Sequence, residues 1–138
     1  MIKYTGFLPH LTISALICFF ETEYLGLNND IYRYELTFSE KCLNPFKTMQ
    51  GGMIASALDE ITSISVNILT KDKMLPSSTD IHVTFHRPIF IGKVIGTAKI
   101  LKLGKTIVSV EGKLYSLEGK LAASALHTAI LTETSKIK

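Results

Sequence analysis

The sequence has no tryptophan, only two cysteines and only four prolines among its 138 residues. The cysteines, Cys18 and Cys42, are too few for a disulfide framework, and neither belongs to a C-x-x-C motif. A disulfide-stapled secreted domain is therefore excluded, and free thiols in a reducing compartment are expected. This indicates a cytoplasmic protein.

The sequence also lacks an apolar run long enough to cross a bilayer. Leu11–Phe20 is apolar but has only ten residues, whereas a membrane-spanning helix needs about 20. With Lys3 ahead of it, the segment faintly resembles the core of a signal peptide, but Glu21-Thr22-Glu23 follows in place of a small-x-small cleavage site. We therefore expect a core segment and no membrane partner.

Neither positive nor negative residues are in large excess. The net charge is +3, charged residues make up 20% and apolar residues 46% of the chain, which excludes a disordered chain. No cluster of Lys and Arg with interleaved aromatic residues appears, so a nucleic-acid partner is not expected. The mild positive charge would suit a small anionic ligand. The length predicts one domain over residues 1–138 with a genuine core.

One stretch is typical of a long amphipathic helix. Met53–Leu69 contains neither glycine nor proline, and at about 100° per residue Asp59 falls roughly opposite an apolar stripe. Asp59 shares its face with small residues, so that face would let another molecule approach a carboxylate. The stripe consists of Ile54, Ala57, Leu58, Ile61, Ile64, Ser65 and Ile68, and the small residues are Gly52, Ala55, Ser56 and Ser63.

The residues just before this helix point to carbonyl chemistry. Gly51 and Gly52 stand where the first N–H groups lack intrahelical partners and the helix dipole is positive. Such an N–H can donate a hydrogen bond to an oxygen that gains negative charge during a reaction. Asp59 lies about two turns further along the helix. The same residues also fit an ordinary turn followed by a solvated Asp, and the spacing leaves both interpretations open.

The remaining segments alternate as antiparallel strands around this helix. In Ile31–Phe38 the residues Tyr32, Tyr34, Leu36 and Phe38 would face inward. In the strand after the helix, Ile81, Val83 and Phe85 would face inward, and Asp80, His82, Thr84 and His86 outward. Leu8–Phe20 fits either a short helix or a strand. The expected strands are Phe19–Leu25, Ile31–Phe38, Ser78–Arg87, Lys93–Leu103, Thr106–Ser116 and Leu121–Thr132, the last three as a meander. One helix against a curved sheet is an α+β arrangement.

Several motifs together resemble a known family. Asn44-x5-Gln50-Gly51-Gly52-x6-Asp59-Glu60 is similar to the Asn…His-Gly-Gly…Asp-Glu pattern of hotdog-fold thioesterases of the phenylacetate-degradation type. The Arg87-Pro88-x3-Gly92 stop, and hairpins at Gly104 and Gly119, follow in the family's order, so the resemblance covers Tyr24 to Leu131. It implies a hotdog fold, in which a long central helix is wrapped by a curved five- to six-stranded antiparallel sheet.

The resemblance also implies roles for individual residues. Asp59 matches the general base or nucleophile, and Asn44 matches the residue that holds the attacking water or the substrate. Gly51 would donate its N–H to the thioester oxygen. Ser78 aligns with a serine that assists in some members, and Ser63 with a Ser or Thr used in sister families. The site would form between two protomers, with the acid from one and the Gly–Asn loop from the other.

Gln50 is a departure from the family pattern, which has His before the glycine pair. An imidazole can move a proton near neutral pH, whereas a glutamine can only donate and accept hydrogen bonds. If the family's His only orients a group, Gln50 can replace it. If that His moves a proton, this chain would be slow or inactive.

The implied function is hydrolysis of a small aromatic or aliphatic acyl-CoA to free acid and CoA. The alternative is a hotdog domain that binds acyl-CoA without cutting it, as a sensor or sink. No cofactor is expected, because the CoA moiety belongs to the substrate. Arg87 would either form a salt bridge at the sheet edge or meet a CoA phosphate, and Lys105 would lie near the CoA tail.

The remaining histidines do not predict a metal site. His82 and His86 share a strand face, but four residues along a strand span about 13 Å, too far for one ion. His10 and His127 have no partners at ligand spacing. A homodimer is expected from an open sheet edge, and the outward face with His82, Thr84 and His86 would join two dimers into a tetramer.

Overall fold

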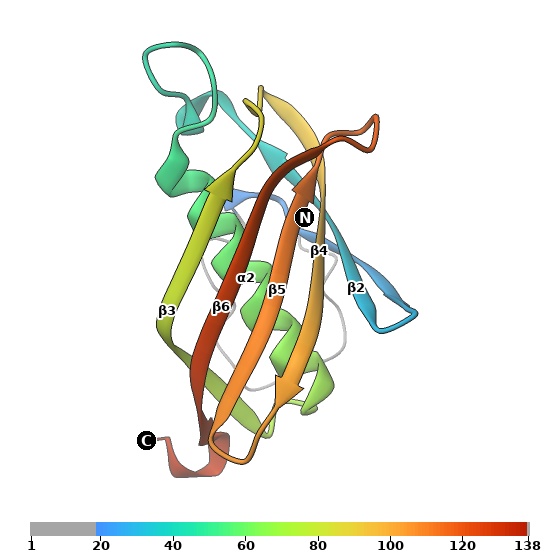
Figure 1. The fold of residues 1–138 in the computed structure, drawn as a ribbon, viewed down its shortest axis with the longest axis vertical. Helices are drawn as coiled ribbons and strands as arrows, with labels where there is room; N and C mark the ends of the chain where they lie inside the picture. Colours follow the sequence, from blue (N-terminus) through green and yellow to red (C-terminus); the bar gives the residue numbers. More distant parts are fainter. Residues whose placement is uncertain (1–18, 138) are drawn as a thin grey trace.

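The computed structural model of the chain describes residues 19–137. Within them, one long helix lies against one face of a six-stranded antiparallel sheet with strand order β1-β2-β4-β5-β6-β3 (Figure 1). This is the predicted α+β arrangement. The elements are β1 (Glu23–Asn28), β2 (Ile31–Phe38), η1 (Glu40–Cys42), α2 (Gly51–Leu69), β3 (Met74–Phe85), β4 (Gly92–Leu103), β5 (Ile107–Tyr115), β6 (Leu121–Glu133) and η2 (Thr134–Lys136).

The inner face of α2 forms the centre of the core. Six residues of the predicted stripe are buried, whereas Ile68 is only half-buried, and Thr62 and Val66 join the buried set. Two glycines of the sheet allow the helix to approach closely. A Cβ on Gly96 would lie 2.8 Å from Ile61 Cδ1, and a Cβ on Gly112 would lie 2.8 Å from Thr62 Cγ2. The helix and the sheet are therefore in direct contact at these two points.

The predicted strand Phe19–Leu25 is wrong in its first half, because β1 begins only at Glu23. Glu21 has φ 46° and turns the chain, and Phe20 is fully buried with its ring 5.3 Å from that of Phe38. The bounds and the inward face of Ile31–Phe38 are confirmed. Cys18 lies outside the described residues, and so does the ambiguous segment Leu8–Phe20 except for Phe19 and Phe20.

Strand β3 forms one edge of the sheet and pairs with β6. Ser78 lies opposite Ala129 and Asp80 opposite Thr128, so Thr79 is an extra residue that makes a β-bulge. A bulge reverses which side chains face inward on either side of it. Simple alternation from Ile81 would turn Ser78 outward, but the bulge turns Ser78 toward α2.

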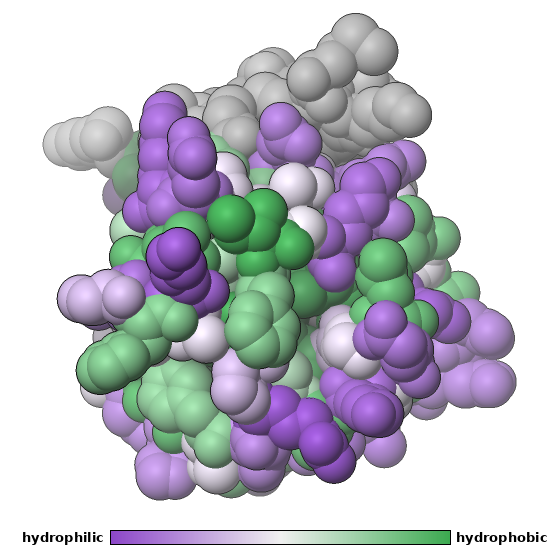
Figure 2. Space-filling model, turned by 90° about the horizontal axis from the view of Figure 1, so that it is seen from above, coloured by the Kyte–Doolittle hydropathy of each residue, from purple (hydrophilic) through white to green (hydrophobic). Residues whose placement is uncertain are grey.

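Three connecting segments lie at the end of the molecule where α2 begins (Figures 1 and 2). They are the loop before α2, the β3–β4 loop and the β5–β6 hairpin. The loop that precedes α2 is joined to the β3–β4 loop by a hydrogen bond from Met49 N to Ile89 O of 2.8 Å. The end of β3 is joined to the start of β6 by a bond from His86 N to Ala122 O of 2.8 Å. Exposed hydrophobic side chains occur there among hydrophilic ones: Phe46, Phe85, Phe90, Ile91 and Leu117.

In the part of the chain from residue 19 to residue 137, no helix has the length and apolar character needed to cross a membrane.

Candidate active site

Asp59 lies in a cluster of polar side chains on the side of α2 that faces β3. Its Oδ1 is 3.2 Å from Ser78 Oγ and 3.4 Å from His127 Nε2. Ser78 Oγ in turn is 2.7 Å from His127 Nε2. The Asp59 side chain is 44% exposed, whereas that of His127 is only 2% exposed. The cluster therefore presents a carboxylate to solvent from a support that is largely buried.

His127 is a site residue that sequence analysis missed. It stands on β6 in a row of inward-facing residues that is otherwise Ala123, Ala125, Ala129 and Leu131. The alternation along this strand contains the signal, because a lone histidine in an inward row of small residues must find polar partners in the core. The partners come from α2 and β3, which are distant in the sequence, so ligand spacing could not reveal them.

The surroundings of His127 favour its neutral form. Burial lowers the pKa of the His127 imidazole, and the smaller effects of the Asp59 and Asp80 carboxylates oppose this shift. A neutral imidazole has one donor and one acceptor nitrogen. His127 can therefore accept a hydrogen bond from a neighbouring hydroxyl at neutral pH.

The start of α2 presents free backbone donors. Gln50 is the N-cap, and its Oε1 accepts a hydrogen bond of 3.0 Å from Met53 N. Gly52 leaves room for this side chain, since a Cβ there would lie 2.8 Å from Gln50 Oε1. Among the described residues, no hydrogen bond takes up the amide N–H of Gly51 or of Gly52. These amides can bind an anionic oxygen.

A pocket of about 330 Å³ adjoins Gly51. It is lined by residues from the loop before α2, the start of α2, and the β3–β4 loop: Thr48, Met49, Gly51, Ile54, Phe85, His86, Arg87, Pro88 and Ile89. The pocket thus combines apolar walls with Gly51, whose amide is free, and with one arginine, Arg87. Such a combination fits a ligand with an apolar part and an anionic part.

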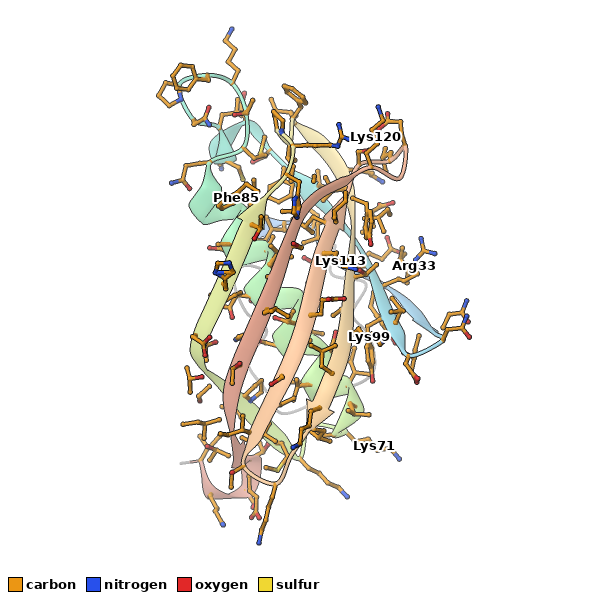
Figure 3. All side chains as sticks on the ribbon, viewed as in Figure 1. Arg33, Lys71, Phe85, Lys99, Lys113 and Lys120 are labelled. Atoms are coloured by element: carbon orange, nitrogen blue, oxygen red, sulfur yellow. The ribbon has the colours of Figure 1, made fainter. Side chains whose placement is uncertain are left out.

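Phe85 faces the helix side of the sheet, as predicted, because it pairs with the buried Ala123, but it is not part of the buried core. Its side chain is 53% exposed, and its ring lies over the helix entry, where a Cβ on Gly51 would be 3.3 Å from the ring (Figure 3). Phe85 is the last residue of β3 and lies beside the first residue of α2, at the end of the helix–sheet contact. It therefore forms a wall of the pocket beside Gly51.

Asn44 and Ser63 are not part of the Asp59 cluster. The Asn44 side chain bonds within its own loop: Nδ2 donates to Thr48 Oγ1 (2.9 Å), and Oδ1 accepts from Phe46 N (2.9 Å). Ser63 lies one turn beyond Asp59 and is half-buried, and no hydrogen bond of its side chain is found among the described residues. The structure therefore brings Ser78 to Asp59 and leaves Asn44 and Ser63 apart from it.

Arg87 and Lys105 lie at opposite ends of the sheet. Arg87 follows β3 at the Gly51 end, whereas Lys105 lies in the β4–β5 hairpin at the end where α2 finishes (Figure 1). The 12-residue strand β4 separates these ends by about 35 Å. Arg87 therefore lines the pocket beside Gly51, whereas Lys105 is not among the residues that line it.

The long helix wrapped by a curved antiparallel sheet is the arrangement of a hotdog fold, and its helix carries an acid midway along it and free amides at its start. The sequence matches the Thioesterase superfamily over residues 46–123, more than half of the chain. The chain therefore belongs to the thioesterase superfamily, whose members hydrolyse thioesters.

Individual relatives agree with this assignment. The proofreading thioesterase EntH of Klebsiella pneumoniae is 28% identical over 109 residues, which are 78% of this chain and 80% of that protein. A phenylacetic acid degradation-related protein of Ralstonia eutropha has a TM-score of 0.80 and 25% identity, with 88% and 93% of the two chains covered. The E. coli PaaI protein shares the fold, with a TM-score of 0.76, 17% identity and 86% and 85% coverage. The hotdog fold is thereby confirmed.

Proposed function

We propose that this protein is an acyl-CoA thioesterase that cleaves a small aromatic or aliphatic acyl-CoA to the free acid and CoA. One observation carries the proposal: a half-exposed Asp59 carboxylate, held against Ser78, lies on the helix whose first amide, at Gly51, is free and faces a pocket. Hydrolysis needs a positioned water, a base beside it and a donor for the developing oxyanion. These residues supply the base and the donor.

Arg87 would bind a phosphate group of the CoA portion of the substrate. Arg87 lines the same pocket as Gly51, and guanidinium groups bind phosphate oxygens in a bidentate manner. The acyl group would lie against the apolar walls. The reaction needs no cofactor besides the CoA moiety of the substrate itself.

The site we propose is shared between two protomers. Gly51 and Asp59 are eight residues apart on one helix, which places them about 12 Å apart along its axis. Reacting groups must approach within about 3–3.5 Å of their target, so the two residues of one chain cannot serve one carbonyl. A two-fold dimer that pairs the open edge of β3 with its own copy would bring Asp59 toward the partner's helix entry.

Within this dimer, Asn44 belongs to the loop that would face the partner's Asp59. Its hydrogen bonds with Thr48 and Phe46 hold this loop in shape. Ser63 would lie on the face of α2 that approaches the partner's loop. The exposed outer face with His82 and Thr84 would then join two dimers into a tetramer. A cytoplasmic location fits the free, buried thiol of Cys42.

The second candidate function is binding of acyl-CoA without cleavage, and Gln50 motivates it. Gln50 is used as a helix cap and cannot transfer a proton. Purified protein should be incubated with a panel of aromatic and aliphatic acyl-CoAs while free thiol is measured. Release of thiol with at least one member supports hydrolysis, whereas saturable binding with no thiol release supports the binding protein.

Gln50→His tests whether the amide limits turnover. We expect thioesterase activity to be kept or raised, with a new pH dependence near the imidazole pKa of about 6.5, because His can donate, accept or move a proton. Protonation of this His would remove the acceptor that caps Met53 N, so activity should fall as the pH falls through its pKa. The measurement is kcat against pH, with Gln50→Ala as the control that removes the cap alone. A flat profile with reduced activity would contradict the expectation.

A further inference from the structure

His127 lies between two hydroxyl groups, and each hydroxyl has only one hydrogen to give. His127 Nδ1 is 2.7 Å from Thr62 Oγ1, and Nε2 is 2.7 Å from Ser78 Oγ. A neutral imidazole carries its hydrogen on one nitrogen and accepts with the other. Both hydroxyls have a further acceptor nearby: two helix carbonyl oxygens at 2.8 and 3.0 Å for Thr62, and Asp59 Oδ1 at 3.2 Å for Ser78. The tautomer is therefore decided by the hydroxyl whose hydrogen is held by the shorter bonds, which is that of Thr62.

The hydrogen of Thr62 is committed to its own helix. Thr62 Oγ1 is 2.8 Å from the Leu58 carbonyl oxygen and 3.0 Å from the Asp59 carbonyl oxygen. Carbonyl oxygens only accept, so the Thr62 O–H must point at them, and Oγ1 must accept from His127 Nδ1–H. The sheet holds Thr62 in this orientation, because its methyl group Cγ2 sits over Gly112, where a Cβ would be 2.8 Å away.

We propose that Thr62 is a positioning residue for turnover, because it fixes His127 in the Nδ1–H tautomer and leaves Nε2 as a proton acceptor facing Ser78. The role in turnover rests on the proposed thioesterase function, whereas the tautomer itself does not. Thr62 is fully buried and cannot touch the substrate. Its effect passes only through His127.

The fixed tautomer sets the direction of the whole chain of hydrogen bonds. Ser78 O–H donates to His127 Nε2, His127 Nδ1–H donates to Thr62, and Thr62 O–H donates to the helix carbonyl groups. Asp59 Oδ1, 3.2 Å from Ser78 Oγ, is a second acceptor within reach of the Ser78 hydrogen, but His127 Nε2 is nearer at 2.7 Å. With that hydrogen on the Nε2 side, Ser78 Oγ and Asp59 Oδ1 are both left as acceptors. Two such oxygens can accept both hydrogens of one water and aim its lone pair at an acyl carbon.

The chain also gives the proton a place to go during hydrolysis. The water oxygen bonds to the acyl carbon as Asp59 takes a water proton. That proton passes to Ser78 Oγ while the Ser78 hydroxyl proton moves to His127 Nε2, which restores the Asp59 carboxylate and leaves an imidazolium 3.4 Å from it. When the C–S bond breaks, the proton returns by the same path to the leaving thiolate.

The charged and titratable groups around His127 define the pH dependence. Asp59 contacts it from α2, and Asp80 on β3 acts on it through its charge; both raise the pKa of His127, but burial lowers that pKa by more. Protonated His127 would donate from Nε2 to Ser78, which would then donate to Asp59 and block the carboxylate. Activity should therefore be lost as the pH falls through the pKa of His127, which lies below its usual 6.5.

The direct test is nitrogen NMR of the protein labelled with ¹⁵N-histidine, with His127 assigned by its loss in His127→Gln. At neutral pH the wild-type protein should show a protonated Nδ1 and an unprotonated Nε2. Thr62→Val keeps the shape but removes the acceptor, so we expect the Nε2–H tautomer and a kcat lowered about tenfold or more. Thr62→Ser keeps the hydroxyl and should keep both the tautomer and the pH profile of kcat.

Thr70→Val is the matched control, because Thr70 Oγ1 makes the same kind of bond to Val66 O (2.9 Å) on α2 without facing His127. It should leave the tautomer and kcat unchanged. An Nε2–H tautomer in the wild-type protein would overturn the inference, even if Thr62→Val failed to fold. An unchanged kcat in folded Thr62→Val would also overturn it. If the wild-type protein released no thiol from any thioester, the proposed function would fail while the tautomer could still be read.

Discussion

Asp59→Asn is expected to lower thioesterase turnover at least about a hundredfold, the scale of losing a general base. The amide keeps the size and the polar contact with Ser78 but cannot take a proton from water. A hundredfold loss corresponds to about 2.7 kcal/mol in the barrier. Steady-state thiol release under saturating substrate measures it directly.

The fold of Asp59→Asn should persist, because the Asp59 side chain is 44% exposed and lies outside the apolar stripe of α2. Thermal unfolding within a few degrees of the wild-type midpoint would show this. Glu60→Gln removes the adjacent carboxylate of the same helix and should leave turnover near the wild-type value. Undiminished turnover in Asp59→Asn would remove Asp59 from the mechanism.

Gly51→Pro should lower kcat by about 10²–10³, the effect of removing one oxyanion donor. Proline lacks the N–H that we assign to the thioester oxygen, yet it is well tolerated at the first position of a helix. Gln50 precedes it with φ −66° and ψ 135°, which is the conformation that a following proline requires. The helix should therefore form while the donor is lost.

Gly51→Ala is the matched control, since it keeps the amide and adds a Cβ that lies 3.3 Å from the Phe85 ring. We expect it to retain most of the turnover, with any loss due to a small shift of Phe85. Circular dichroism of both variants would verify the helix. Equal losses in Gly51→Ala and Gly51→Pro would mean that crowding against Phe85, and not the donor, is responsible.

Local periodicity predicted most of the fold. The stripe on α2 and the alternation in β2 each depend on contacts that repeat within one element, so their faces could be derived from sequence alone. The strand predicted from Phe19 began too early because Glu21 adopts a left-handed conformation that composition does not reveal. Phe85 continues the inward alternation of β3 but lies past the end of the core.

The site was predicted less completely, because its geometry depends on contacts between elements. The position of Ser78 beside Asp59 results from the bulge at Thr79, which alternation cannot show. His127 joins them from β6 across 49 residues of sequence. The motif resemblance pointed to Asp59, Gly51 and Ser78, but the histidine and Thr62 became visible only when the sheet was assembled.

The measurement that most directly tests the shared site is complementation between Asp59→Asn and Gly51→Pro chains, each nearly inactive alone. After the two are unfolded together and refolded in equal amounts, random pairing makes about half of the dimers mixed, and each mixed dimer has one intact site. The account predicts recovery to about a quarter of the wild-type activity, since a quarter of all sites regain both residues. No recovery in refolded dimers, or an active monomer in light scattering at micromolar concentration, would contradict it.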